Sequence, residues 1–316
     1  MSSAGLPRHI QIRRHYDRNR YMRHLTQDEL NVRIRDVFLN MLRLTPEGKV
    51  SVPPIDDAFA IWNEKWTHVL EEMQLRHGPY PSGFTRDILH REPFPDLVSE
   101  LARKAAKVMS EKGLARGQVF IKFGQRKHME ALHLSGQLRV QPASGFANKA
   151  FNPAVRDDEL ALNIALFLTR DQILKVVKNP EDVPADAPDQ RVDMQFRSLS
   201  DYWLYCVTNS IEPRLFADFN ADSCVIIRNR KAFKDRLIKA AEARFSSAAL
   251  REGDAVYVDP LLPKDANIFV PFAKHFGFSY QDEHRFCWLP NKAAAKLEHV
   301  DLQLGDLSGI SELVTF

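Results

Sequence analysis

The stretch His275–Pro290, HFGFSYQDEHRFCWLP, combines five aromatic residues with the polar run Gln-Asp-Glu and a following Arg285. In an extended chain, side chains alternate between two faces. Extension over Phe278–Leu289 therefore predicts that Gln281, Glu283 and Arg285 share one face. A Glu and an Arg among apolar neighbours lose hydration, which is unfavourable unless the charges pair or serve a function. Glu283 is thus either half of a structural ion pair with Arg285 or a carboxylate with a chemical role.

The whole chain has the composition of a globular protein. Its 316 residues are 44% hydrophobic and 27% charged, which suits one large domain or two modest ones. The formal net charge of +3 is nearly balanced and does not impose general polyanion binding. No run of about 18 apolar residues appears, so we expect no membrane contact. Three dispersed cysteines without metal-ligand spacing, and an N-terminus without a signal-peptide core, predict a cytoplasmic protein.

The first third of the sequence has helical patterns. Thr26–Glu29 is a capping box, and apolar residues then recur at helical spacing as far as Leu42. Further helices are expected near residues 59–73 and 95–112. We expect residues 1–115 to form a helical N-terminal region, whose apolar ridges either pack into a core or bind a protein partner.

Residues 8–24, RHIQIRRHYDRNRYMRH, hold six arginines and three histidines against one acid. Such a basic arm with interleaved tyrosines is able to contact DNA or RNA through phosphates and stacking. The alternative is an arm that packs on an acidic face of its own protein.

From Gly113 onward, strand patterns predominate. We expect strands at residues 118–122, 138–141, 192–196, 202–207, 223–227, 255–258, 279–289 (with a break) and 300–304, and helices at 126–135 and 232–243. The apolar run 160–168 fits either type, and residues 179–191 form an exposed, proline-rich insertion. Residues 116–316 are therefore expected to form an α+β domain with a mixed or antiparallel sheet.

Common signatures of nucleotide, zinc and hydrolase sites are absent from the sequence. One candidate anion site remains at the start of the helix 126–135. Gly124 permits close approach of a ligand, the first helical N–H groups favour an anion such as pyrophosphate, and Lys122, Arg126 and His128 add positive charge. The alternative is a solvated turn between strand and helix.

Two further segments are candidates for polar contacts. In FNPAVRDDEL, residues Asn152, Arg156 and Asp158 either line a substrate loop or precede a helix, where acids are common. At the end of the strand YWLYCVT, Thr208 is placed either to hydrogen-bond a neighbouring carboxylate or to begin a turn.

The ordered motifs KFGxxxHMEALxxxGxL, RDDEL, YWLYCVT and YQDEHRFCWL resemble those of a group of uncharacterised bacterial domains. Their layout over residues 118–305 also resembles the ADP-ribosyltransferase superfamily, especially toxin-like members that modify DNA or RNA. Two departures are the Lys122-Phe123-Gly124 sequence, where members carry Arg or His-x-Thr, and the lack of a full Ser-Thr-Ser on the middle strand.

The resemblance implies a fold of ADP-ribosyltransferase type and a role for each matching residue. Glu283 corresponds to the catalytic glutamate, Gln281 to the residue two before it and Thr208 or Ser210 to the middle-strand hydroxyl. Lys122 or His128 stands near the first-strand contact with NAD. Pyrophosphate neutralisation by Arg126 or Lys122 and nicotinamide stacking by Tyr280, Phe278 or Trp203 complete the implied site, with Gly124 beside it.

The resemblance therefore implies an enzyme that consumes NAD, as a toxin or anti-phage effector that modifies nucleic acid or protein. One alternative is a nucleic-acid-binding or nuclease-like module, based on residues 8–24 and on Arg228–Lys231. Another is an interaction protein that uses its helical N-terminal region.

Overall fold

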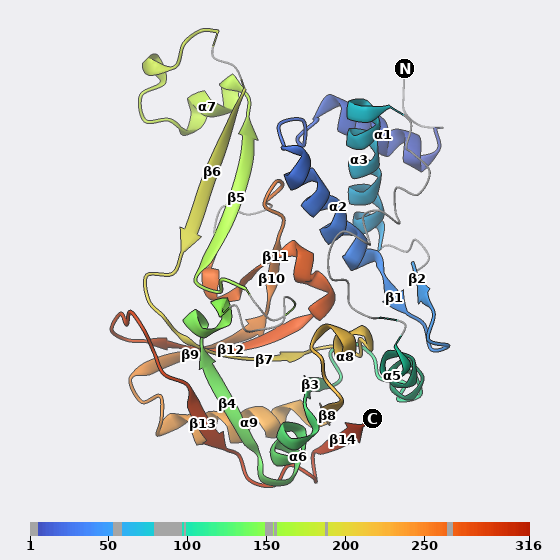
Figure 1. The fold of residues 1–316 in the computed structure, drawn as a ribbon. Helices are drawn as coiled ribbons and strands as arrows, with labels where there is room; N and C mark the ends of the chain where they lie inside the picture. Colours follow the sequence, from blue (N-terminus) through green and yellow to red (C-terminus); the bar gives the residue numbers. More distant parts are fainter. Residues whose placement is uncertain are drawn as a thin grey trace.

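The computed structural model describes residues 6–52, 59–78, 97, 99–148, 154, 157–186, 189–263 and 268–316. Helices α1 (Arg8–Arg18), α2 (Gln27–Met41) and α3 (Ala60–His77) gather on one side of the molecule, and a β-sheet lies below them in Figure 1. A long hairpin of β5 (Ala161–Leu168) and β6 (Gln190–Arg197) projects beside these helices. The expected α+β class is confirmed. None of the described helices is long and apolar enough to cross a membrane.

Residues 8–24 do not form a free arm. They make helix α1 and a following turn, and Tyr16, Tyr21 and Met22 are buried against α2 and α3. The Tyr16 hydroxyl donates to the Glu72 carboxylate at 2.5 Å, and Arg20 pairs with the same carboxylate at 2.7 Å. The segment therefore packs on acids of its own chain, which is the second of the two arrangements expected for it.

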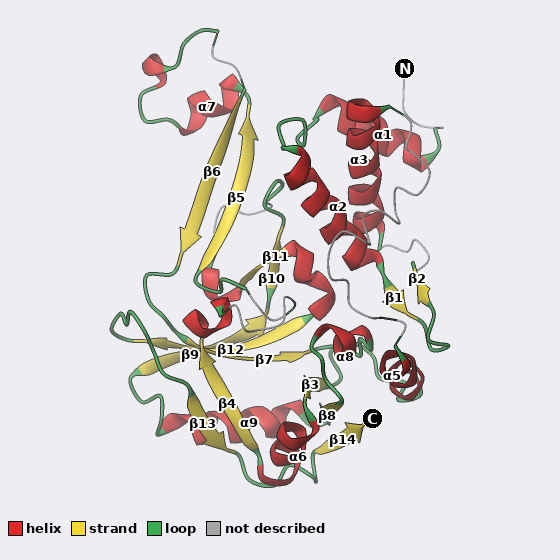
Figure 2. Ribbon diagram, viewed as in Figure 1, coloured by secondary structure: helices red, strands yellow, loops and turns green. Residues whose placement is uncertain are grey.

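The main sheet, whose strands are yellow in Figure 2, is antiparallel. Its strands in the described residues are β3 (Phe120–Gly124), β4 (Gln137–Pro142), β7 (Trp203–Thr208), β8 (Ser223–Ile227), β9 (Ala248–Asp254), β12 (Glu283–Pro290), β13 (Val300–Gln303) and β14 (Ser311–Thr315). One edge of β7 pairs along its length with β12. Its other edge is shared, because β4 pairs at Trp203–Leu204 and β3 pairs only at Thr208. The sheet therefore splits at β7.

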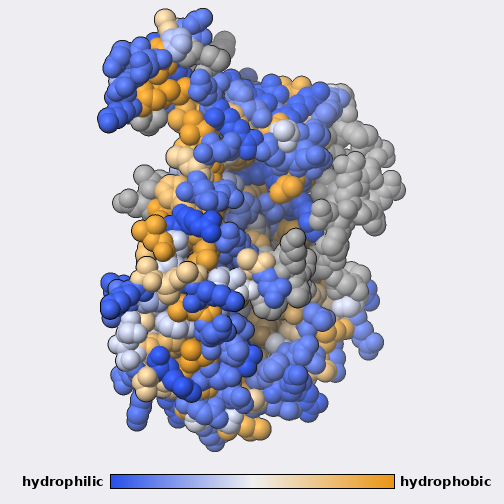
Figure 3. All heavy atoms as spheres, turned by 60° about the vertical axis from the view of Figure 1, so that its left-hand side comes forward, coloured by the Kyte–Doolittle hydropathy of each residue, from blue (hydrophilic) through white to orange (hydrophobic). Residues whose placement is uncertain are grey.

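Helices cover both faces of this sheet. The aromatic core around Phe120 and Phe286 is completed by α6 (Arg126–Ser135) and α9 (Arg230–Glu242). Side chains of α5 (Glu100–Ser110) and α8 (Arg214–Asp218) pack with Ile121 and Phe123 in another cluster. Helix α5 thus belongs with the sheet, although it lies within the first 115 residues. On the face shown in Figure 3, polar side chains predominate and apolar ones lie in small groups.

The expected extension over Phe278–Leu289 is wrong at its N-terminal end. Residues Phe276–Gln281 form the 3-10 helix η4, Asp282 has a left-handed backbone with φ of 45°, and β12 begins only at Glu283. The turn is fixed by Asn40 of α2, which donates to the Gly277 carbonyl at 2.8 Å and accepts from the Tyr280 N–H at 2.9 Å. Asn40 thus supplies hydrogen-bond partners to the Gly277 carbonyl and the Tyr280 N–H in the 3-10 conformation, and these two groups would point in other directions in an extended chain.

The remaining elements are short. They are β1 (Arg43–Leu44), β2 (Val50–Ser51), β10 (Val256–Val258), β11 (Ala273–His275), α7 (Arg170–Val176), η1 (Ala143–Ala147), η2 (Pro180–Asp182) and η3 (Val270–Phe272). The run 160–168, which fitted either type, is strand β5. Residues 179–186, the described part of the insertion expected at 179–191, are mostly exposed and lie at the tip of the β5–β6 hairpin, while residues 190 and 191 already belong to β6.

Candidate active site

A cavity of about 250 Å³ lies where β3, β7 and β12 meet. We call it the carboxylate cavity, and its lining includes Lys122, Gly124, Glu159, Cys206, Thr208, Lys274, Gln281 and Glu283. Five of the residues expected at a site are among them: Lys122, Gly124, Thr208, Gln281 and Glu283. Three segments far apart in the sequence therefore meet at one opening.

Strand pairing places the two central residues. Glu283 is the first residue of β12 and lies opposite Thr208 of β7, which in turn lies opposite Ile121 of β3. The Thr208 hydroxyl donates to the Ser210 carbonyl at 2.9 Å. Its oxygen therefore remains available to the cavity only as an acceptor.

Glu283 carries a fixed negative charge. Its Oε1 accepts from Lys274 Nζ at 2.6 Å, and its Oε2 accepts from Arg285 Nε at 3.0 Å. Burial alone would raise the pKa of Glu283, but the charges of Lys274 and Arg285 prevail and lower this pKa to about 2. The side chain is therefore ionised and oriented at neutral pH.

A second carboxylate completes the charge cluster. Glu159 accepts two hydrogen bonds from Arg285, at 2.8 and 3.0 Å, and its Oε1 lies 3.6 Å from Lys274 Nζ. Two buried anions and two buried cations thus balance, as buried charges must. Nearby Asp157 is different: burial first, and then Glu159, raises the pKa of Asp157 to about 6.

Sequence reasoning missed both Glu159 and Lys274. The signal for Lys274 was present, because VPFAKHFG places one lysine in an otherwise apolar run. A lysine buried to 4% exposure is rare unless it is paired. Glu159 lay in a segment where a helix start was one expectation, but the chain turns there into strand β5.

Gln281 lines the carboxylate cavity and has an unpaired acceptor. Its Nε2 donates to the Ala154 carbonyl at 2.7 Å, while its buried Oε1 has no hydrogen-bond partner within the described residues. An unpaired buried acceptor is unfavourable unless a ligand supplies the donor. A ligand with an N–H or O–H group suits this position.

Lys122 is held at the wall of the cavity. Its Nζ donates to the Cys206 carbonyl at 2.7 Å and lies 4.7 Å from the centroid of the Tyr205 ring. Burial lowers the pKa of Lys122, and the proximity of Cys206 and Glu283 offsets this in part. Gly124 lines the same wall, where a Cβ atom would meet the Met129 side chain at 2.9 Å.

Three expected residues do not reach the carboxylate cavity. The Arg126 side chain pairs with Glu130 at 2.7 Å, and the Arg126 N–H donates to Asp222 Oδ1 at 2.7 Å. A carboxylate of this chain thus occupies the helix N-terminus where pyrophosphate was expected. His128 lines a separate hollow beside β4. Tyr280 is buried beneath the Arg214 guanidinium, 3.8 Å from its ring centroid, because η4 replaces the expected strand.

In the loop before β5, Asn152 and Arg156 lie outside the described residues. Asp158 accepts from the Leu160 N–H at 3.1 Å and stabilises the turn. The cavity thiol of Cys206 has a pKa raised to about 12, first by burial and then by Glu283, so it is not an activated nucleophile.

No cluster of metal-ligating side chains occurs among the residues that the structure describes. The chain matches no known family model, no curated protein and no solved structure. Its function must therefore be inferred from the chemistry of its own residues.

Proposed function

We propose that the protein consumes NAD, cleaving the bond between nicotinamide and ribose at the carboxylate cavity. The observation that carries the proposal is the ionised Glu283, held by Lys274 and Arg285 on a wall shared with Thr208 and Gln281. The resemblance of the sequence to ADP-ribosyltransferases implied that Glu283, Gln281 and Thr208 act together. Their shared cavity supports that proposal.

The chemistry requires a fixed anion. As the C–N bond breaks, its electron pair leaves with nicotinamide and the ribose carbon becomes positively charged. A preorganised carboxylate stabilises such a cation most strongly in a cavity from which water is largely excluded. The pKa of Glu283, about 2, ensures that this charge is present. Because Glu283 is then a weak base, its proposed role is electrostatic, and the proton of the attacking water or acceptor hydroxyl passes to solvent or to another base.

The size of the cavity limits what enters it. Sites for whole drug-sized ligands have volumes of about 300–1,000 Å³, whereas the carboxylate cavity has about 250 Å³. It suits the nicotinamide end of the dinucleotide, with the remainder outside. The unpaired Oε1 of Gln281 would accept from the carboxamide N–H or a ribose hydroxyl.

The test is nicotinamide release from NAD, measured by chromatography. Glu283→Gln keeps the shape and removes the charge, so we expect the rate to fall by about 100-fold or more. Gln281→Met, which removes the free acceptor, should raise KM. Glu298→Gln changes an exposed glutamate outside the cavity and serves as the matched control.

Equal release by wild type and Glu283→Gln, with both folded by circular dichroism, would remove Glu283 from the mechanism. No release by the wild type, and no NAD binding by calorimetry, would overturn the proposal as a whole.

A second proposal concerns the outer face of α1. Arg8, Arg14 and Arg18 are exposed there, and no ion pair is found for them within the described residues. We propose that this face contacts the phosphates of DNA or RNA, as a binding surface or as the site that presents an acceptor. The inward arginines, such as Arg20, are already paired.

Binding to single- and double-stranded oligonucleotides at several salt concentrations tests this surface. Arg14→Glu/Arg18→Glu should weaken binding and lower the salt slope by about 2. The control Lys292→Glu/Lys296→Glu makes the same charge change at two exposed lysines outside residues 8–24 and 228–231. Binding that is absent at low salt, or equal in both double variants, would contradict the proposal.

A further inference from the structure

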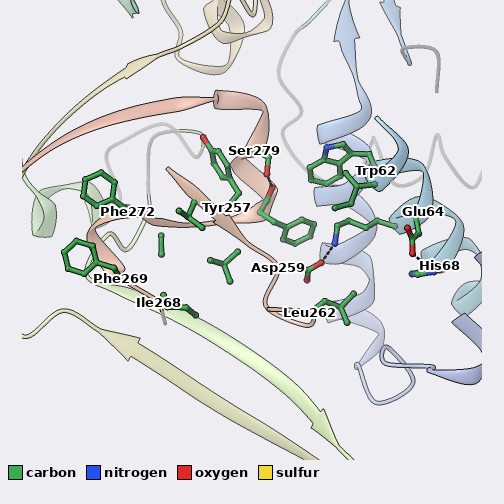
Figure 4. Close-up of a pocket in the computed structure, with 16 residues that line it drawn as sticks. Trp62, Glu64, His68, Tyr257, Asp259, Leu262, Ile268, Phe269, Phe272 and Ser279 are labelled. Carbon is green, nitrogen blue, oxygen red and sulfur yellow. Dashed lines mark hydrogen bonds and ion pairs between the residues drawn. The ribbon is translucent and has the colours of Figure 1, made fainter. Parts of the chain in front are cut away.

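A second, larger cavity of about 690 Å³ lies between α3 and the β10–β11 pair (Figure 4). We call it the aromatic cavity, because Trp62, Phe269, Phe272 and Phe276 line it. The rings of Phe269 and Phe272 stack at 5.9 Å with an angle of 16° between their planes. Figure 4 shows these two rings on one side and Trp62 and His68 across from them. Flat aromatic walls of this kind favour a planar ligand.

Apolar surface is exposed around the same cavity. Ile61, Val256 and Phe269 all line it, with exposures of 39%, 58% and 53%. Single exposed apolar residues are ordinary, but several around one concave site indicate a binding function.

The cavity has one polar edge with an unused hydrogen-bonding atom. His68 is 4% exposed, its Nδ1 lies 3.2 Å from the Tyr21 hydroxyl, and its Nε2 has no hydrogen-bond partner in the described residues. Glu64 lies 3.9 Å from that Nε2, beyond hydrogen-bond range. Burial, followed by the charge of His15, lowers the pKa of His68 to about 4, so the ring is neutral.

The charged groups of this edge are balanced. Lys65 pairs with Asp259, which also accepts two hydrogen bonds from Arg33 at 2.7 Å. The ligand that suits the cavity therefore has a neutral, planar aromatic body and one hydrogen-bonding atom directed at His68.

The aromatic and carboxylate cavities share a wall. Tyr257 lines the aromatic cavity, and its hydroxyl accepts from the Glu283 N–H at 2.9 Å. On β11, Ala273 lines the aromatic cavity and the next residue, Lys274, lines the carboxylate cavity. A ligand against Tyr257 is thus one side chain away from the backbone of Glu283.

We propose that the aromatic cavity is a second ligand site, for a neutral planar aromatic molecule, and that its occupancy stabilises Glu283 through Tyr257. The binding step stands independently of NAD chemistry. Any effect of this ligand on the rate of NAD cleavage rests on the proposed function.

N-phenyl-1-naphthylamine, a neutral amine with a planar naphthalene ring and one N–H, is a suitable probe, because its fluorescence rises in apolar sites. We expect saturable binding to the wild-type protein and about tenfold weaker binding to Phe269→Ala. Leu199→Ala is the matched control, since Leu199 is 97% exposed and lies outside the cavity. Equal binding to Phe269→Ala and Leu199→Ala, or no saturable binding to the wild type, would overturn the site.

Coupling is tested by hydrogen exchange of the Glu283 amide. The probe should slow this exchange in wild type, and Tyr257→Phe should abolish the effect while it still binds the probe. Unchanged exchange in probe-saturated wild type would overturn the coupling. Because neither measurement needs turnover, failure of the NAD proposal, seen as no nicotinamide release, is distinguishable from failure of this site.

Discussion

Glu283 has its charge set by two cations from different parts of the fold. Lys274 comes from β11 and Arg285 from β12, and each binds one carboxylate oxygen. Removal of one partner from a buried pair leaves an uncompensated charge, which typically costs about 3–5 kcal/mol. At this site, the integrity of the fold and the ionisation of the candidate catalytic residue depend on the same contacts.

Lys274→Met should lower the free energy of unfolding by about 3–5 kcal/mol at pH 7. The double variant Lys274→Met/Glu283→Gln should recover part of this loss, because the unpaired anion is gone. Guanidinium unfolding measures both. The control is Lys231→Met, which breaks an exposed pair with Asp235 on α9 and should change stability little. A similar, small loss in both single variants would contradict the balance that we describe.

The pH dependence of stability provides a second prediction for this residue. The folded chain lowers the pKa of Glu283 from 4.5 to about 2. The stabilisation is therefore present above pH 4.5 and is lost as the pH falls towards 2. The stability difference between wild type and Glu283→Gln should shrink over this range. A difference that stays constant between pH 5 and pH 3, as measured by unfolding in urea, would refute the assignment.

At the scale of elements, η4 depends on a helix more than 200 residues away in the sequence. Asn40 is 1% exposed and binds the Gly277 carbonyl and the Tyr280 N–H. Asn40→Leu should leave these groups unpaired, at about 1–3 kcal/mol each. We expect faster hydrogen exchange at Tyr280, with Asn31→Leu on the same helix as the control. Equal exchange rates in the two variants would show that η4 holds its shape without Asn40.

The elements that the sequence predicts correctly are those with local signals. Helix α6 has the bounds that the sequence predicts. Its end is marked by Gly136, which adopts a left-handed φ of 68° at a place where a Cβ atom would meet the Gly305 carbonyl at 2.3 Å. In contrast, η4 replaces a pattern that reads as a strand, because its hydrogen bonds come from Asn40. Strand β9 was missed, since its sequence AALREGD is too polar to show strand alternation.

The same distinction applies to the candidate site. Thr208 lies at the strand end that the sequence predicts, whereas Glu283 was expected inside a strand and begins β12 only because η4 precedes it. Arg126 and Tyr280 do not join them, because their partners, Asp222 and Arg214, come from segments that no local pattern connects to them. Long-range partners therefore decide which expected residues reach the cavity.

At the scale of the whole molecule, the N-terminal helices and the sheet region are joined by buried contacts. Arg33 of α2 pairs with Asp259 through two hydrogen bonds of 2.7 Å, and Trp62 of α3 stacks on Phe276 at 5.9 Å. Both Arg33 and Asp259 are buried. A buried ion pair and a ring contact between the two regions hold them as one cooperative unit.

We therefore expect one unfolding transition in calorimetry, and a fragment 116–316 that fails to fold because Phe276 and Leu261 lose their cover. Asp259→Asn should shift the whole transition downward by several degrees. Asp301→Asn, which weakens an exposed pair with Arg139, is the control. Two separate transitions, with only one sensitive to Asp259→Asn, would indicate independent domains.

The split of the sheet at β7 has a consequence for the role of Lys122. Where two strands diverge from one edge, the backbone between them loses its ladder partners, and at Cys206 the carbonyl receives the ammonium of Lys122 instead. The Lys122 side chain thus pairs a carbonyl group that has no main-chain partner on this edge of β7. At this split, the need to pair a backbone carbonyl, rather than packing, determines the residue type at position 122. A residue without a side-chain donor at position 122 would leave the buried Cys206 carbonyl without the partner that Lys122 supplies.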